Sequence, residues 1–257
     1  MTGTDEQNGH DERDGREEAV VFGDVHGNVA ALEAVFGDMA ARGLGGDRYC
    51  LGDLVGYGTF PNEVVEFVRS RGIPTIAGNY DEGVGANSDD CGCAYGTEEE
   101  RRRGDRSIAW TNEAITEGNR AYLRELDEHI ELELGDLRVV LVHGSPRRVN
   151  EYLYEDRPDS SFERLLDSVD ADVLVCGHTH LPYHKVLPSG RHFVNAGSVG
   201  KPKDGDPRAC YVALYGEGEA FEVAFHRVGY DVERTARAIE DSGIPSEFAE
   251  MLRTGTS

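Results

Sequence analysis

Short apolar runs recur along the chain, and most of them end at a glycine followed by a polar residue. A run of four or five apolar residues between turn residues is typical of a buried strand. Between these runs, apolar residues three and four positions apart predict amphipathic helices. The expected strands are 19–22, 48–51, 73–77, 139–142 and 172–176, and the expected helices are 28–42, 61–71, 105–116, 119–126 and 160–169. Alternation of strands and helices indicates the α/β class.

After residue 180 the pattern changes from strand and helix to pairs of strands. Two strand-like runs on either side of a short glycine-containing turn predict a hairpin. The two expected hairpins are 183–187 with 191–195 and 209–215 with 220–228. A helix over 231–240 and a short tail complete the chain. The sequence shows no internal repeat and no sign of a second domain, so we expect a single domain over 17–257.

The balance of charges is strongly acidic, with 26 Lys and Arg against 49 Asp and Glu and a formal net charge of −23 in 257 residues. Without a basic footprint, a stable nucleic-acid or anionic-membrane partner is not expected. The acidic residues are spread along the chain, as in a solvated surface adapted to a high-salt, halophilic-like cytoplasm. Residues 1–16 are polar and charged, so we expect a disordered acidic N-terminal tail.

The five cysteines show no Cys-x-x-Cys spacing, which fits a reducing cytosol better than a disulfide framework. No apolar stretch approaches membrane-spanning length, and the N-terminus lacks the apolar core of a signal peptide. We therefore expect a soluble, cytoplasmic protein. The hairpins could expose a sheet edge for dimerisation, which leaves a homo-oligomer open.

Polar residues follow each of the five expected strands, on loops that begin with glycine or, after 139–142, with a histidine followed by glycine. All are oxygen or imidazole donors, which suit Mn, Fe or Zn. These residues are Asp24, His26, Asp53, Asn79, His143, His178 and His180. A single Asp or His at a strand end is more often a turn or a helix cap, but independent caps would not select this donor set together. Seven donors are too many for one tetrahedral ion and fit two ions that share a carboxylate, for which Asp53 is the natural bridge.

The segment 82–104 has no periodic apolar pattern and directly follows Asn79. A long irregular segment inside a compact domain is usually functional or mobile, so we expect a loop or lid beside the site. Cys91-Gly-Cys93 lies in this segment and could be a redox or metal-sensing pair. Because Cys-x-Cys is poor geometry for a local disulfide, a plain loop is the preferred interpretation.

The motifs GDVHGN, GDLVGYG, GNYD, VHGSP and GHTH follow in this order. Their series resembles the calcineurin-like metallophosphoesterase superfamily, and NAGSVGKPKDGDPR resembles its small prokaryotic phosphodiesterases. The resemblance implies a four-layer α/β/β/α sandwich of two mixed sheets. It implies one ion on Asp24, His26 and His180, a second on Asn79, His143 and His178, and Asp53 between them. It also places Asn28 in contact with the phosphate.

This resemblance implies a dinuclear-metal phosphoesterase that hydrolyses small-molecule phosphodiesters by in-line attack of a metal-bridging hydroxide. Two divalent ions are the expected cofactors, with Mn ahead of Fe, Zn, Ni or Mg. The partner is a small phosphate-ester substrate. The alternatives are a phosphomonoesterase or nucleotide phosphatase at the same site, a nuclease, and a non-catalytic binding scaffold of the same fold. Substituted ligand positions would indicate a scaffold, and all seven positions are intact.

Two departures from the family pattern bear on the substrate. Where the family usually has His in GNHD, this chain has Tyr80, a phenol with an ordinary pKa of about 10. A phenol with this pKa donates a proton poorly at neutral pH, which predicts weak activity on alkyl monoesters and better activity on diesters. The alternative is that Tyr80 only packs the lid. GDLVGYG also lacks the Asp-Arg-Gly of Ser/Thr protein phosphatases and many diadenosine tetraphosphate hydrolases, which disfavours those two substrate classes.

Overall fold

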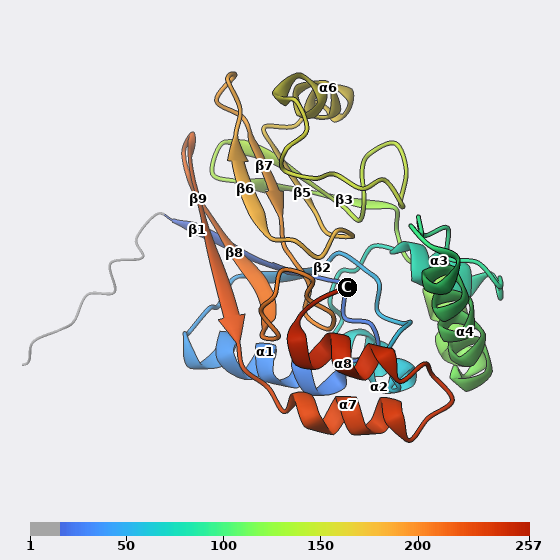
Figure 1. Ribbon diagram of the computed structural model, residues 1–257. Coiled ribbons are helices and arrows are strands. Elements are labelled where there is room, and N and C mark those ends of the chain that lie inside the picture. The colour runs from blue at the N-terminus through green and yellow to red at the C-terminus, as the bar shows by residue number, and fades with distance from the viewer. Residues whose placement is uncertain (1–15) are drawn as a thin grey trace, which may run out of the picture.

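Two mixed β-sheets form the centre of the computed structural model, which describes residues 16–257 (Figure 1). In the four-stranded sheet the order is β2 (Asp47–Cys50), β1 (Glu17–Phe22), β8 (Ala209–Glu217) and β9 (Ala220–Val228). In the five-stranded sheet it is β3 (His129–Leu134), β4 (Leu137–Val142), β5 (Val173–Cys176), β7 (His192–Asn195) and β6 (Tyr183–Val186). Strand β1 is parallel to β2 and antiparallel to β8, and β4, β5 and β7 are parallel. The predicted tail, except for its last residue, lies outside the described residues.

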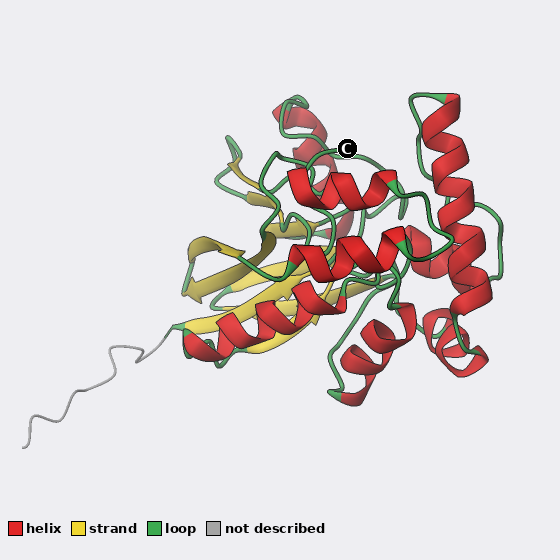
Figure 2. Cartoon of the chain, turned by 60° about the horizontal axis from the view of Figure 1, so that its bottom comes forward, coloured by secondary structure: helices red, strands yellow, loops and turns green. Residues whose placement is uncertain are grey.

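Helices lie around the periphery of the two sheets (Figure 2). They are α1 (Val29–Ala41), α2 (Pro61–Ser70), α3 (Asn79–Gly85), α4 (Glu98–Ala114), α5 (Glu117–Arg124), α6 (Asp159–Val169), α7 (Val232–Glu240) and α8 (Glu247–Thr254). Figure 1 shows α6 over the five-stranded sheet, and α1, α7 and α8 on the far side of the four-stranded sheet. No helix among residues 16–257 is long and apolar enough to cross a membrane.

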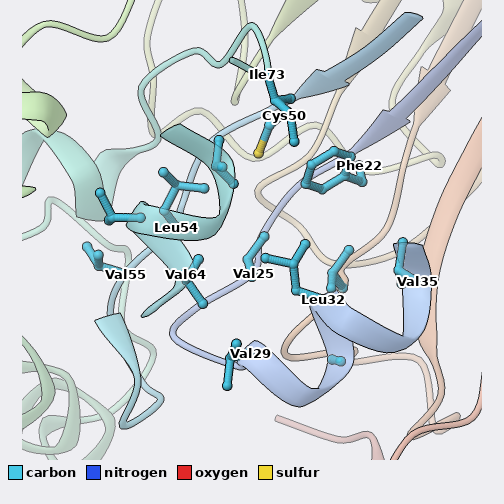
Figure 3. Close-up of a cluster of buried hydrophobic side chains, with 14 of the residues drawn as sticks. Phe22, Val25, Val29, Leu32, Val35, Cys50, Leu54, Val55, Val64 and Ile73 are labelled. Atoms are coloured by element: carbon cyan, nitrogen blue, oxygen red, sulfur yellow. The ribbon is translucent and has the colours of Figure 1, made fainter. Parts of the chain in front are cut away.

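Alternation along the strands divides the core into layers. In β1, Val20 and Phe22 pack with α1, and Figure 3 shows Phe22 in the same cluster as Leu32 and Val35 of that helix. The intervening Ala19 and Val21 pack against the other sheet. Strand β4 follows the same rule, because Val139 and Leu141 face the first sheet whereas Val140 and Val142 face α6. Successive side chains of a strand point to opposite faces of the sheet. When both faces are covered, every position of the strand is buried and needs an apolar residue. The predicted α/β/β/α sandwich of two mixed sheets is confirmed.

Several element predictions were wrong. Residues 73–77 form no strand, only isolated bridges from Thr75 to Cys50 and from Ile76 to Asp127. Pro74 cannot donate a hydrogen bond to a ladder, which limits pairing at this point. A strand region was expected to begin at His129, as β3 does, but without bounds, because β3 alternates polar and apolar residues at a sheet edge. Helix α8 was not predicted, because it falls within the short tail.

The segment 82–104 is less irregular than predicted. Its first residues belong to α3, and α4 begins at Glu98 rather than at residue 105. The Thr97 side chain accepts from the Glu100 backbone N–H, and the Glu100 carboxylate accepts from Thr97 in return, a capping box. The first turns of α4 are almost wholly polar, so apolar spacing could not reveal them. A lid function for this segment and a single domain over 17–257 stay predictions.

Candidate metal centre

The candidate ligands come from both sheets and meet at one edge of the sandwich. Asp24 and His26 follow β1, Asp53 follows β2, His143 follows β4, and His178 with His180 follows β5. Asn79 is the first residue of α3. Loops at the carboxyl ends of strands are where ligands bind in α/β sheets. The β1 and β2 loops are joined by backbone hydrogen bonds from Asp24 to Gly52 (2.9 Å) and from His26 to Asp53 (2.8 Å).

One group of donors consists of Asp24, His26 and His180. The Nε2 atoms of His26 and His180 are 3.3 Å apart, and Oδ1 of Asp24 is 3.3 Å from Nε2 of His180 and 3.9 Å from Nε2 of His26. All three residues are buried. A carboxylate and two imidazole nitrogens converging at this separation form a suitable set for one divalent ion.

A second group consists of Asp53, His143, His178 and Asn79. Nε2 of His143 is 3.4 Å from Oδ2 of Asp53 and 3.2 Å from Oδ1 of Asn79. Asp53 Oδ2 also lies 3.6 Å from Nε2 of His26 in the first group. The structure therefore brings all seven predicted ligands together and places Asp53 between the two groups. Gly78 is required here, because a Cβ at this position would overlap the Asp53 carboxylate.

Strained backbone is concentrated at these ligands. Asp24, His26, Asp53, His178 and His180 all have positive φ, between 48° and 65°. Residues other than glycine rarely adopt this region, which costs roughly 1 kcal/mol or more for each. The strain aims several side chains from one loop at a common point, and strain of this kind gathers at functional sites.

The imidazoles are oriented by backbone carbonyls. Nδ1 of His26 donates to Val55 O (3.0 Å), Nδ1 of His143 to Leu51 O (2.8 Å) and Nδ1 of His180 to Lys201 O (2.5 Å). A hydrogen on Nδ1 leaves the lone pair of Nε2 directed into the centre, as in metal-binding histidines.

Burial and charge divide the histidines into two kinds. Burial lowers the pKa of His26 to about 3 and the pKa values of His178 and His180 well below the usual range. These three rings are neutral at pH 7, the form that binds a metal. Burial also lowers the pKa of His143, but the carboxylate of Asp53 outweighs it and raises that pKa to about 10.

Two buried polar atoms at the centre have no hydrogen-bond partner among residues 16–257. They are Oδ1 of Asp24 and Nε2 of His178. An unpaired buried carboxylate oxygen or imidazole nitrogen is costly, whereas coordination of a cation satisfies both. The donor set and these two atoms fit a dinuclear divalent-metal site.

Metal affinity is expected to rise with pH between about 6 and 9. His143 must lose its proton to bind an ion, and its pKa in the metal-free protein is raised to about 10. Below that pKa the proton competes with the metal, so each pH unit should change affinity about tenfold for a one-proton exchange. Competition with a chromogenic chelator, corrected for the chelator's own titration, measures this slope. An affinity that stays constant across the range would contradict the assignment of His143.

Two residues that support the ligands were not predicted from the sequence to do so. Asp81 is fully buried and accepts from Leu54 N (2.9 Å) and Gly78 N (3.0 Å), which ties the Asp53 loop to α3. Asn195 donates to Gly177 O (2.8 Å) and thereby braces the turn that carries His178 and His180. Both stand in motifs of the sequence, GNYD and NAGS, so their positions were visible although their roles were not.

Cysteines of the 86–97 loop orient Asn79. Its Nδ2 donates to Cys91 O (2.9 Å) and Cys93 Sγ (3.2 Å), so Oδ1 is directed toward His143. Cys91 and Cys93 are free thiols with their sulfur atoms 2.8 Å apart. The loop is therefore joined directly to the centre, as its place after Asn79 predicted.

Asn28 is the N-cap of α1, and its amide is fully used by the protein. Oδ1 accepts from Ala31 N (3.2 Å) and Thr235 Oγ1 (2.9 Å), and Nδ2 donates to Gly200 O (3.0 Å) and Tyr230 Oη (3.1 Å). A phosphate contact from this side chain would require one of these bonds to break. The contact stays a prediction.

Tyr80 is buried, and its ring packs at 5.4 Å from the His26 ring and 4.7 Å from the Tyr57 ring. Its backbone N–H donates to Asp53 Oδ1 (2.8 Å), so position 80 fixes the candidate bridge whatever its side chain. Burial raises the pKa of the phenol well above 10, which keeps it neutral. These contacts are consistent with a packing role for Tyr80 and also with a role as a weak proton donor.

A cavity of about 240 Å³ lies beside the centre. Thr179 lines it, as do Cys93, which contacts Asn79, and Tyr152, whose ring is 4.1 Å from that of His178. Lys201 and Lys203 also line it and were not singled out by the sequence analysis. Burial lowers the pKa values of both lysines. An anion in the cavity would favour their charged forms.

Comparison with known proteins supports a phosphoesterase. An uncharacterized protein of Methanocaldococcus jannaschii is 32% identical over 252 residues, covering 91% of this chain and 97% of that protein. A metallophosphoesterase from Sphaerobacter thermophilus has a similar structure, with a TM-score of 0.73, 29% identity, and 94% and 100% of the two chains covered. A hypothetical protein from Pyrococcus horikoshii shares the fold, with a TM-score of 0.80, 23% identity, and 93% and 99% covered. The family model of the calcineurin-like phosphoesterase superfamily domain matches residues 18–218, so the chain belongs to this superfamily.

Proposed function

We propose that the chain is a dinuclear-metal phosphodiesterase that hydrolyses small-molecule phosphodiesters. The observation that carries the proposal is the position of Asp53 Oδ2, 3.6 Å from His26 Nε2 and 3.4 Å from His143 Nε2, between two groups of donors. Two divalent ions held there would lower the pKa of water between them and offset charge on a phosphate. Mn²⁺ is our first choice, because mixed carboxylate, amide and imidazole donors suit it.

The chain's own residues supply positioning and charge. His26, His178 and His180 are neutral, so each has a nitrogen lone pair available to bind a metal ion. The Tyr80 N–H holds Asp53 in place. Lys201 and Lys203 bring two amino groups to the cavity where the phosphate ester would enter, and a bound anion would favour their charged forms. The neutral phenol of Tyr80 donates a proton reluctantly, which favours esters whose leaving group needs no proton.

A non-catalytic scaffold is less well supported. A binding surface has no need for five ligands in strained backbone or for unpaired atoms at Asp24 and His178.

The five free cysteines support a reducing, cytoplasmic location, and the net charge of −23 opposes a nucleic-acid partner.

The test is hydrolysis of bis(p-nitrophenyl) phosphate beside p-nitrophenyl phosphate, with Mn²⁺ and after chelation, at high salt. We expect chelator-sensitive turnover that favours the diester. Preference for the monoester would replace the proposal by a phosphomonoesterase or nucleotide phosphatase. No turnover with any metal, despite stoichiometric metal binding, would favour the scaffold.

Tyr80→His should raise turnover of alkyl phosphate monoesters about tenfold or more, because a positioned general acid contributes ~10²–10⁴-fold when the leaving group needs a proton. Activity on p-nitrophenyl esters should change little. Tyr80→Phe is the matched control, since it keeps the buried ring and the backbone N–H but gains no acid. If the histidine variant keeps its fold and metal content but gains nothing, Tyr80 is a packing residue.

A further inference from the structure

Lysine is rare in this chain, and two of its three lysines line one cavity. The three are Lys185, Lys201 and Lys203, against 49 acidic residues. Lys185 pairs with Asp159 at 2.9 Å. Among residues 16–257, neither Lys201 nor Lys203 forms a direct ion pair, although Lys201 is only 5% exposed and the carboxylates of Asp24, Asp53 and Glu100 act on Lys203 from a greater distance. In so acidic a protein, two buried lysines without a direct ion pair at one site indicate that an anion from outside binds there and favours their charged forms.

Both lysines are placed to act together with the metal centre. Lys201 is held by its backbone, because its carbonyl accepts from His180 Nδ1 (2.5 Å) and its N–H donates to Ser198 Oγ (2.8 Å). Its Nζ lies 4.9 Å from the Tyr57 ring and 5.8 Å from the Phe248 ring. A phosphate bound at the centre would therefore have one side against the candidate metal ligands and the other against lysine.

Aromatic rings form much of the remaining wall of the cavity. They belong to Tyr57, Tyr95, Tyr152, Tyr154 and Phe248. The rings of Tyr152 and Tyr154 are nearly parallel, at 15° with centroids 6.0 Å apart, and Tyr154 is 45% exposed. An exposed tyrosine face in the wall of the cavity that the lysines also line is a surface on which a planar ring can stack. At about 240 Å³, the cavity is below the ~300–1,000 Å³ of most small-molecule sites and has room for one ring system.

A larger groove of about 700 Å³ is a weaker candidate for the substrate. It touches only His143 among the candidate ligands, and Glu82, Glu128 and Glu131 line it. Two of its three arginines are already paired, Arg147 with Glu151 at 2.5 Å and Arg138 with Glu131 at 3.0 Å. The smaller cavity is also lined by one glutamate, Glu100, but three basic residues, Lys201, Lys203 and Arg103, outnumber it there, so the smaller cavity is favoured.

We propose that the cavity lined by Lys201, Lys203 and Tyr154 binds the phosphate and one planar aromatic ester group of the substrate. The substrate class is thus a phosphodiester carrying an aryl or nucleobase ring. The proposal rests on the proposed function, because it treats the ligand as a substrate of the metal centre. The lysines pair with phosphate oxygens that do not face the metals, and the tyrosine rings stack on the aromatic group.

Binding of non-hydrolysable phosphonates to the Mn²⁺-loaded protein tests this, by titration calorimetry at fixed salt. We expect phenylphosphonate to bind about tenfold more tightly than methylphosphonate, in the range of aromatic stacking. The phosphonate analogue of adenosine 5′-monophosphate is a third ligand; if it binds more tightly than phenylphosphonate, the ring is a nucleobase rather than a simple aryl group.

Two variants separate the contributions. Lys203→Gln should weaken both phenylphosphonate and methylphosphonate about tenfold and keep their ratio, whereas Tyr154→Ala should remove the preference for phenylphosphonate alone. Lys185→Gln and Phe225→Ala are the controls, because Lys185 pairs elsewhere and Phe225 is a 37% exposed ring on β9. Thermal melting and metal analysis verify fold and loading.

Equal affinity for the two phosphonates, or equal losses for both in Tyr154→Ala, would overturn the aromatic site while leaving diester hydrolysis intact. An unchanged affinity in Lys203→Gln would overturn the role of the lysines. If the metal-loaded protein binds neither phosphonate and hydrolyses no ester, both the proposed binding cavity and the proposed function are wrong. If it prefers phenylphosphonate yet hydrolyses nothing, the cavity stands as a binding site and the catalytic proposal alone fails.

Discussion

Removal of divalent metal should abolish ester hydrolysis and lower the melting temperature by roughly 8–16 °C. Asp24 and Asp53 are 0% and 2% exposed, so their charges depend on nearby cations. An ion present at a thousandfold excess over its dissociation constant stabilises the folded state by ~4 kcal/mol. In a domain of this size each kcal/mol moves the midpoint by about 2–4 °C. Calorimetry with and without chelator, with metal content measured in both samples, gives the shift.

Re-addition of Mn²⁺ should restore both properties, which distinguishes a metal effect from damage by the chelator. A variant that lacks a candidate ligand, such as His180→Ala, should show a smaller shift than the parent protein. If the melting temperature and turnover remain unchanged once the metal is shown to be gone, the buried carboxylates do not serve a metal site.

Much of the fold could be predicted because its strands are covered on both faces. The apolar runs at 19–22, 139–142 and 172–176 were predicted as strands and belong to β1, β4 and β5. The elements that were missed or predicted only in part have weaker apolar signals. The first turns of α4 carry Glu and Arg, and β3 exposes alternate residues at a sheet edge.

The candidate site was predicted from donor types at strand ends, and the structure brings all seven donors together. What the sequence could not reveal is how they are held. Positive φ at Asp24 and Asp53 depends on hydrogen bonds between loops, and Asp81 acts through backbone groups of other segments. The positions of Lys201 and Lys203 are plain in the sequence, but only the three-dimensional packing places both in the wall of one cavity.

Asp53→Asn should lower turnover of a phosphodiester about 10³-fold or more, equivalent to ~4 kcal/mol of transition-state stabilisation. Asp53 Oδ2 is the candidate oxygen nearest both donor groups. An amide is neutral and offers one oxygen, so it cannot bridge two cations as a carboxylate does. Its remaining oxygen can still accept from the Tyr80 N–H, now at 2.8 Å from Oδ1, so the fold should survive. Metal analysis should find fewer ions bound per chain.

A second readout of this variant is independent of turnover. The negative charge of Asp53 raises the pKa of His143 to about 10, against the effect of burial. In metal-free Asp53→Asn that charge is gone, so the His143 pKa should fall from about 10, because burial then acts against fewer stabilising charges. NMR of the histidine ring measures this directly. Asp47→Asn, an exposed change at the start of β2, is the control and should alter neither property. Full metal loading and near-normal turnover in Asp53→Asn would show that Asp53 is no bridge, and a His143 pKa that stays near 10 would mean that another charge holds its proton.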